Sequence, residues 1–266
     1  MRYLDAYKYI LKSPNWMMNI LIGLASGFVP IAGPMVFTGY LLESMEKMLR
    51  TGDEKPRDFD VNRLAAYLVR GLWPFLVMMV VSIPFTVLLT CCGGVSVLAG
   101  FALGGGAGIV LGYLLAFFGI LVGSFLVSLV SLPMRIRAGF TLNFGSAFEL
   151  AFVKDFFRRV GKEVVLVELF IVGSSLVLTI AGLLACCVGI YVVMPVVQFA
   201  ACHLTYQLLK RYEERGGMPI PFKPYHSGRR YEDDRYEDDR YEDEAPPPPR
   251  EEGPPAPPDE RISPAP

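Results

Sequence analysis

The stretch GLWPFLVMMVVSIPFTVLLTCC, residues 71–92, decides the fold, because it contains no Asp, Glu, Lys or Arg. A helix needs about 20 consecutive apolar residues to cross the hydrocarbon of a bilayer, and charges within such a run are strongly disfavoured. Residues 108–132 and 190–209 are also uncharged, and 164–187 contains one charge, Glu168. Four such helices in a water-soluble protein would leave too little polar surface for the solvent. The sequence therefore predicts an all-α, polytopic transmembrane helical bundle.

A further apolar region, residues 16–42, is uncharged but has Pro30 and Pro34 in its middle. Proline removes a backbone donor and clashes with the preceding turn, so a straight helix through both prolines is not expected. The region is either one kinked span or a tight hairpin of two short helices. We prefer the hairpin, which gives five to six spans in three hairpins: 15–29 with 34–49, 71–92 with 108–132, and 164–187 with 190–209.

Charge in the loops predicts the orientation. Loops 43–70 and 133–163 each carry six Lys or Arg residues, whereas residues 93–107 carry none. Positive charge accumulates in cytoplasmic loops, so we expect a protein of the cell membrane with both charged loops and the C-terminus in the cytoplasm. The N-terminus should also be cytoplasmic, because it carries Arg2, Lys8 and Lys12. The five-span alternative would place it outside.

The 266 residues divide into a multi-pass transmembrane domain, residues 1–211, and a tail, residues 212–266. Residues 1–225 contain 19 Lys and Arg against 13 Asp and Glu, whereas residues 226–266 contain 6 against 13. The acidic, proline-rich tail has too few apolar residues to offset its chain entropy, so we expect it to be disordered. It could bind a protein partner or associate with another copy, although a solvated spacer is the plainer interpretation.

Aromatic residues in the second charged loop recur at helical spacing. Phe144, Phe148 and Phe152 are four residues apart, which is typical of an amphipathic helix lying in the membrane interface. Phe59, Leu64 and Leu68 form a shorter version in the first charged loop. We expect these interfacial helices to seal the inner face of the bundle. Docking of a partner or sensing of lipid is the alternative.

A family resemblance lies in the run GPMVFTGYLLESMEKMLRTGDEKPRDFD, residues 33–60, together with Asn143-Phe144 and with His203-Leu204 before Gln207. These residues resemble the uncharacterised bacterial and archaeal membrane family called domain of unknown function 4013. The resemblance covers roughly residues 10–210. It implies a multi-helix membrane domain and no assigned activity.

Polar residues inside the apolar runs are the candidate site. Ionisable groups in a bilayer are costly and often functional, which singles out Glu168 and His203, with Asn19 and Gln198 as polar companions. On the hairpin topology Glu168 and His203 both lie toward the cytoplasmic side, where they could pair and support proton or cation transport. The plainer interpretation is that both lie close enough to the interface to find hydrogen-bond partners.

Small residues predict helix contacts, because they let helix backbones approach closely. Four glycines are spaced four residues apart, and we expect them to pack within the chain rather than between copies: Gly100, Gly104, Gly108 and Gly112. Two adjacent cysteine pairs are read as small apolar residues, since neither disulfide nor metal geometry follows from their spacing: Cys91 with Cys92, and Cys186 with Cys187. We expect no metal and no cofactor.

Catalytic motifs such as HExxH and GxSxG do not occur in this sequence, so we do not expect an enzyme. Nucleic acid is not an expected partner; the lipid bilayer is. We expect a non-enzymatic membrane scaffold or interaction protein with a cytoplasmic docking tail. The alternative is a small transporter or channel that uses Glu168 and His203. The oligomeric state stays open.

Overall fold

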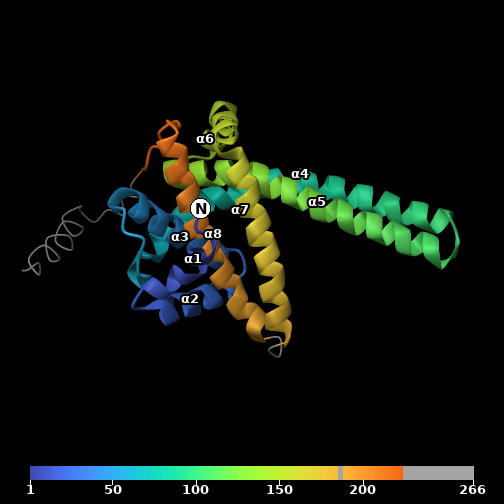
Figure 1. Cartoon of the computed structure of the whole chain (residues 1–266), viewed down its shortest axis with the longest axis horizontal. Coiled ribbons are helices and arrows are strands. Elements are labelled where there is room, and N and C mark those ends of the chain that lie inside the picture. Colours follow the sequence, from blue (N-terminus) through green and yellow to red (C-terminus); the bar gives the residue numbers. More distant parts are fainter. Residues whose placement is uncertain (185–187, 224–266) are drawn as a thin grey trace, which may run out of the picture. The chain divides into compact units, whose positions relative to one another are not determined.

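The computed structural model describes residues 1–184 and 188–223, and every regular element in these two ranges is a helix (Figure 1). Met1–Tyr225 form one compact unit. The predicted disorder of the tail from residue 224 on, and the pair Cys186 and Cys187, lie outside the described residues. In chain order the helices are α1 (Tyr3–Lys8), η1 (Ile10–Lys12), α2 (Trp16–Phe28), α3 (Ala32–Thr51), η2 (Val61–Arg63), α4 (Leu64–Ala102), α5 (Gly105–Thr141), α6 (Phe144–Ala147), α7 (Leu150–Leu184) and α8 (Val188–Glu214).

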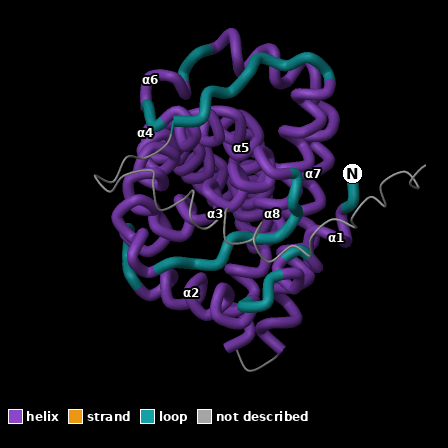
Figure 2. The backbone as a smooth tube through the Cα atoms, turned by 90° about the vertical axis from the view of Figure 1, so that its left-hand side faces the viewer, coloured by secondary structure: helices purple, strands orange, loops and turns teal. Residues whose placement is uncertain are grey.

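The three predicted hairpins are present. They are formed by α2 with α3, α4 with α5, and α7 with α8, and Figure 1 shows α4 and α5 side by side along their whole length. Figure 2 turns the molecule so that its helices and the loops joining them can be followed from another side.

Within residues 1–184 and 188–223, four helices are long and apolar enough to cross a membrane, namely α4, α5, α7 and α8. This is fewer than the five to six spans expected. The apolar region 16–42 accounts for the difference, because it divides into α2, with only 13 residues, and α3, whose second half carries charged residues. The polytopic helical membrane fold is thus confirmed, with the first hairpin shorter and more polar than predicted.

A tight turn separates α2 from α3, as the prolines predicted. The N–H of Ala32 donates to the carbonyl of Pro30 at 2.7 Å, and Ile31 between them has φ +66° and ψ −62°. These angles are those of the rare, strained γ-turn. Pro34 then lies in the first turn of α3, where its missing N–H breaks no helical hydrogen bond.

Glycines hold α4 and α5 together near their tip. A Cβ on Gly100 would lie 2.5 Å from the carbonyl oxygen of Gly108, and one on Gly112 would lie 2.8 Å from that of Ser96. Gly104 has φ +73° and forms the turn itself. The uncharged loop predicted at 93–107 is much shorter in the structure, because both helices continue almost to this turn.

A second glycine contact joins α3 to α4. A Cβ on Gly39 would lie 1.9 Å from the carbonyl oxygen of Tyr67, and one on Gly71 would lie 1.8 Å from that of Met35. Neither position can accept a side chain without separating the two helices. This crossing therefore fixes the first hairpin against the second.

The predicted amphipathic helix through Phe144 and Phe148 is broken into pieces. α6 covers only one turn, and α7 then begins at Leu150 and changes direction at Val160, where φ is −128°. Phe152 is fully buried, whereas Phe148 is partly exposed. The first part of α7, before Val160, thus packs through its aromatic face onto the core instead of lying free in an interface.

An aromatic core fills the end of the unit where the charged loops lie. Phe152 and Phe156 pack against Tyr212, which is fully buried. Ile220 beyond it is also buried, so the compact unit continues past the domain boundary predicted at residue 211. The reason is that α8 continues beyond its apolar run to Glu214, and its charged last turns still bury the ring of Tyr212.

Candidate functional site

Titratable side chains from several parts of the chain meet in the helical unit, some buried and some exposed, where they form what we call the charged layer. Its members come from the N-terminal segment, α3, the linker after α3, α4 and α8. Buried charges are costly unless they are paired and hydrogen-bonded, so the partners of each one matter. The charged layer consists of Arg2, Lys12, Glu43, Glu46, Glu54, Arg57, Arg63, Arg70 and His203.

Glu43 of α3 is buried and receives two guanidinium groups from the linker. Its Oε1 lies 3.1 Å from Nη1 of Arg57 and 2.5 Å from Nη2 of Arg63. The hydroxyl of Tyr40, one turn earlier on α3, donates to the backbone carbonyl of Arg57 at 2.6 Å. One carboxylate and one phenol thus hold the linker against α3.

Glu46, one turn further along α3, is buried and bridges to α4. Its Oε2 lies 2.6 Å from Nη1 of Arg70, and its Oε1 lies 2.6 Å from Nη2 of Arg50. Arg70 also donates through Nη2 to the backbone carbonyl of Lys223 at 3.3 Å. The buried guanidinium therefore joins α3, α4 and the segment that follows α8.

Glu54 in the linker is the carboxylate that meets the N-terminal segment. Its Oε2 lies 3.0 Å from Nζ of Lys12, and Arg2 pairs with its Oε1. Partial burial raises the pKa of Glu54, but the hydrogen bond from Lys12 and the positive charges around it outweigh burial, so the pKa lies below its ordinary value. The ionised form of Glu54 is the one that the fold favours.

His203 of α8 is fully buried and stacks on Tyr9, with 4.9 Å between ring centroids. Its Nδ1 lies 3.2 Å from the amide nitrogen of Gln207, which is a donor, so the ring proton belongs on Nε2. Nε2 in turn lies 3.9 Å from Oε2 of Glu54. Gln207 also accepts a hydrogen bond from the backbone N–H of Arg2 at 2.8 Å, which fixes its amide.

Glu168 has different surroundings. It is buried on α7, and the hydroxyl of Ser128 on α5 donates to its Oε2 at 3.2 Å. Among the described residues no hydrogen bond or ion pair joins Glu168 to His203, so the structure does not bring together the pair considered from the sequence.

The two polar companions lie on different helices, α2 and α8. Asn19 of α2 is buried, donates to the hydroxyl of Ser13 at 3.3 Å and accepts from the backbone N–H of Phe59 at 3.4 Å. It therefore joins α2 to the linker beside the charged layer. Gln198 lies half-buried on α8, more than one turn before His203.

Sequence reasoning missed the carboxylates of the charged layer, because in residues 43–70 only the positive charges were used, as a signal of orientation. A signal was available in that stretch. Its six cations are matched by six anions, which indicates mutual pairing rather than a free positive surface: Glu43, Glu46, Asp53, Glu54, Asp58 and Asp60.

Metal ligation has no candidate in the part of the chain that the structure describes, where no three His, Cys, Asp or Glu side chains are grouped for it. Cys91 and Cys92 are exposed on α4. Cys202 is buried on α8 and donates its S–H to the carbonyl of Leu41 at 3.4 Å. The described cysteines thus behave as isolated thiols.

Comparison with known proteins gives one match. A model of a protein family, described as "Protein of unknown function (DUF4013)", matches residues 22–201. Neither the curated proteins nor the solved structures contain a match. The matched segment covers α3, α4, α5 and α7, and with them the ion pairs of Glu43 and Glu46 and the contact of Ser128 with Glu168. Asn19 and His203 lie outside it.

Proposed function

Because the chain belongs to the family of unknown function DUF4013, which supplies no activity, we propose a role from the geometry. The protein is a non-enzymatic scaffold of the cell membrane that presents its charged end and C-terminal tail to a protein partner in the cytoplasm. The observation that carries this proposal is the charged layer, which links α3 of the first hairpin, α4 of the second and α8 of the third into what we call the platform.

The platform is held by contacts between elements far apart in the sequence. Arg70 and Glu46 join α4 to α3, and Arg215 after α8 pairs with Glu163 of α7. The backbone N–H of Lys223 donates to the carbonyl of Phe140 at 2.9 Å, which fastens the segment after α8 to the end of α5. The described chain is therefore fastened to the platform up to Lys223.

The orientation follows from charge. Loops 43–70 and 133–163 carry six cations each, and the positive-inside rule favours the cytoplasm for such loops. A partner with access to the cytoplasm would meet the tail and the platform together.

Transport through Glu168 and His203, the alternative function, has weaker support. Each of these side chains is buried among its own partners, Ser128 for Glu168 and Tyr9 with Gln207 for His203. Transporters usually gather polar groups at one site near the middle of the membrane. Separate, packed environments suit a structural role for both residues.

Co-purification tests the docking role. The full chain and a chain ending at Tyr225 are extracted in mild detergent from the native membrane, and the bound proteins are identified. A third protein, the tyrosine variant, keeps the length and the acidic charge of the tail but replaces Tyr231, Tyr236 and Tyr241 with Ser. We expect a partner that binds the full chain and is lost on truncation, with weaker capture by the tyrosine variant. Identical partners for the full and truncated chains would contradict the proposal.

A further inference from the structure

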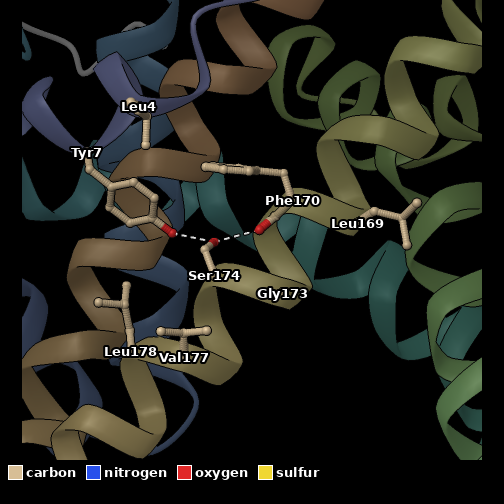
Figure 3. Close-up of a pocket in the computed structure, with 8 residues that line it drawn as sticks. All are labelled: Leu4, Tyr7, Leu169, Phe170, Gly173, Ser174, Val177 and Leu178. Carbon is tan, nitrogen blue, oxygen red and sulfur yellow. Dashed lines mark hydrogen bonds between the residues drawn. The ribbon is translucent and has the colours of Figure 1, made fainter.

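An open groove of about 500 Å³ lies between α1 and α7, as Figure 3 shows. This volume falls in the range of about 300–1,000 Å³ that is common for small-molecule sites. Leu4 and Tyr7 form its wall on α1, and Leu169, Gly173 and Val177 follow one another at spacing four on α7. The groove thus runs along one face of a helix that can span the membrane.

The wall of the groove is apolar because its polar atoms are already bonded. The hydroxyl of Tyr7 donates to Ser174 Oγ at 2.6 Å, and Ser174 donates to the carbonyl of Phe170 at 2.6 Å (Figure 3). The groove is also preformed, because Ala6 of α1 is fully buried against Val167 and its neighbours. A ligand here would meet hydrocarbon and aromatic surface.

The side chains around the groove are exposed, although they belong to an apolar span. Leu169, Leu176 and Val177 are each more than half exposed. Apolar side chains of a spanning helix that face outward are covered by lipid tails. An acyl chain is therefore the natural occupant of an open, apolar groove on this surface.

Cations precede the groove along α7, with Lys162 after the bend at Val160 and Lys154 and Arg158 before it. Lys154, Arg158 and Lys162 are exposed at spacing four, whereas the ion pairs that α7 makes within the described residues go through Asp155, Arg159 and Glu163. Lys162 precedes Leu169 by two helical turns, which is about 10 Å along the same face. A phosphate near Lys162 would have its acyl chain at the start of the groove.

We propose that the groove binds an acyl chain of a phospholipid with a net negative headgroup, whose phosphate contacts Lys162 and Arg158. Each cation near a membrane surface strengthens the attraction of anionic lipid by about fivefold. This site goes beyond the proposed scaffold function, and it stands or falls independently of any partner of the tail.

The test is native mass spectrometry of the full chain released from detergent with equal amounts of phosphatidylglycerol and phosphatidylcholine. We expect retention of phosphatidylglycerol in preference to phosphatidylcholine. Lys162→Gln should weaken this retention about fivefold, whereas Lys210→Gln, which removes an exposed cation of α8, should leave it unchanged. Equal retention of both lipids, or equal effects of both variants, would overturn the assignment of an anionic headgroup.

Filling the groove tests the acyl chain separately. A Cβ on Gly173 would meet no atom within 4 Å, so the side chain of Gly173→Leu starts in open space at the groove. Gly94→Leu on α4 is the matched control, because it adds the same side chain at an equally open, exposed glycine. We expect loss of bound phosphatidylglycerol with Gly173→Leu alone. Unchanged lipid binding by Gly173→Leu would overturn the proposal. Loss of a dimer from the mass spectrum, with lipid binding unchanged, would also overturn it and would assign the groove to a second copy of the chain.

Discussion

Arg70 of α4 and Glu46 of α3 form an ion pair inside the protein, with Nη1 of the arginine 2.6 Å from Oε2 of the glutamate and both residues less than a tenth exposed. Taking two charges out of water costs free energy of solvation. Here the attraction between the two partners offsets part of that cost. The pair joins the short first hairpin to the long second one. It makes the charged end of the molecule a single packed unit.

Removing one member of this pair should destabilise the fold strongly. Glu46→Gln or Arg70→Met leaves a buried charge without its partner, which costs about 3–5 kcal/mol of unfolding free energy. Arg50→Gln is the control, because Arg50 contacts the same carboxylate from the surface and should contribute less than about 1 kcal/mol. Thermal unfolding in detergent measures both effects. A loss of stability no larger for Glu46→Gln than for Arg50→Gln would contradict this assignment.

Alanine should not be tolerated at the crossing of α3 and α4. Gly39→Ala and Gly71→Ala each place a Cβ within 2 Å of a backbone carbonyl oxygen, so the helices must separate and the core between them must open. Gly94→Ala on the open face of α4 should be neutral or stabilising by up to about 1 kcal/mol, through helix propensity. Yield of folded protein in gel filtration distinguishes the three variants. Wild-type behaviour of Gly71→Ala would show that the crossing is looser than described.

Acid should weaken the contact of the N-terminal segment with the linker. The pKa of Glu54 lies below its ordinary value of 4.5, so its ionised form stabilises the fold above that value. This contribution disappears as the pH falls through the lowered pKa, when the carboxylate loses its charge. Thermal stability measured from pH 7 downward should therefore decline less in Glu54→Gln than in wild type below about pH 4.5. Parallel pH curves for the two proteins would argue against the ion pairs with Arg2 and Lys12.

Glycine should improve the turn between α2 and α3. Ile31 is exposed and holds a positive φ that strains a β-branched residue, at a cost of about 1–3 kcal/mol. Ile31→Gly should therefore raise the unfolding temperature, whereas Ile31→Val keeps the branch and should not. Differential scanning calorimetry of the purified proteins in the same detergent compares their unfolding temperatures. A lower unfolding temperature for the glycine variant would speak against the γ-turn.

The sequence predicted the hairpins well because their signals are local. Long uncharged runs and the prolines at 30 and 34 act through nearby backbone and through the membrane, which needs no knowledge of the rest of the fold. The glycine spacing likewise located Gly100, Gly108 and Gly112 at a helix contact, although Gly104 belongs to the turn. The crossing of α3 and α4 at Gly39 and Gly71 joins two different hairpins, and no local sequence pattern indicates it.

The site was harder to predict, since it depends on pairing at long range. Arg2 meets Gln207 and Glu54, and Arg70 meets Lys223, across separations that only the folded chain closes. Sequence reasoning selected charges that interrupt apolar runs, such as Glu168, because a single charge among apolar residues can be recognised from the sequence alone. The carboxylates of α3 were overlooked because a balanced set of charges looks like a solvated loop until its partners are known.

We expect all three hairpins to enter the membrane from one side, the side of the charged layer. Single cysteines introduced on a cysteine-free background, labelled with an impermeant maleimide in intact cells and in inverted vesicles, test it most directly. Suitable exposed positions are Thr51→Cys, Lys154→Cys and Lys210→Cys for the charged end, and Leu103→Cys for the tip of the second hairpin. We expect the first three to react only from the cytoplasmic side and Leu103→Cys never to react from that side. Labelling of Thr51→Cys and Lys154→Cys from opposite sides would contradict the account.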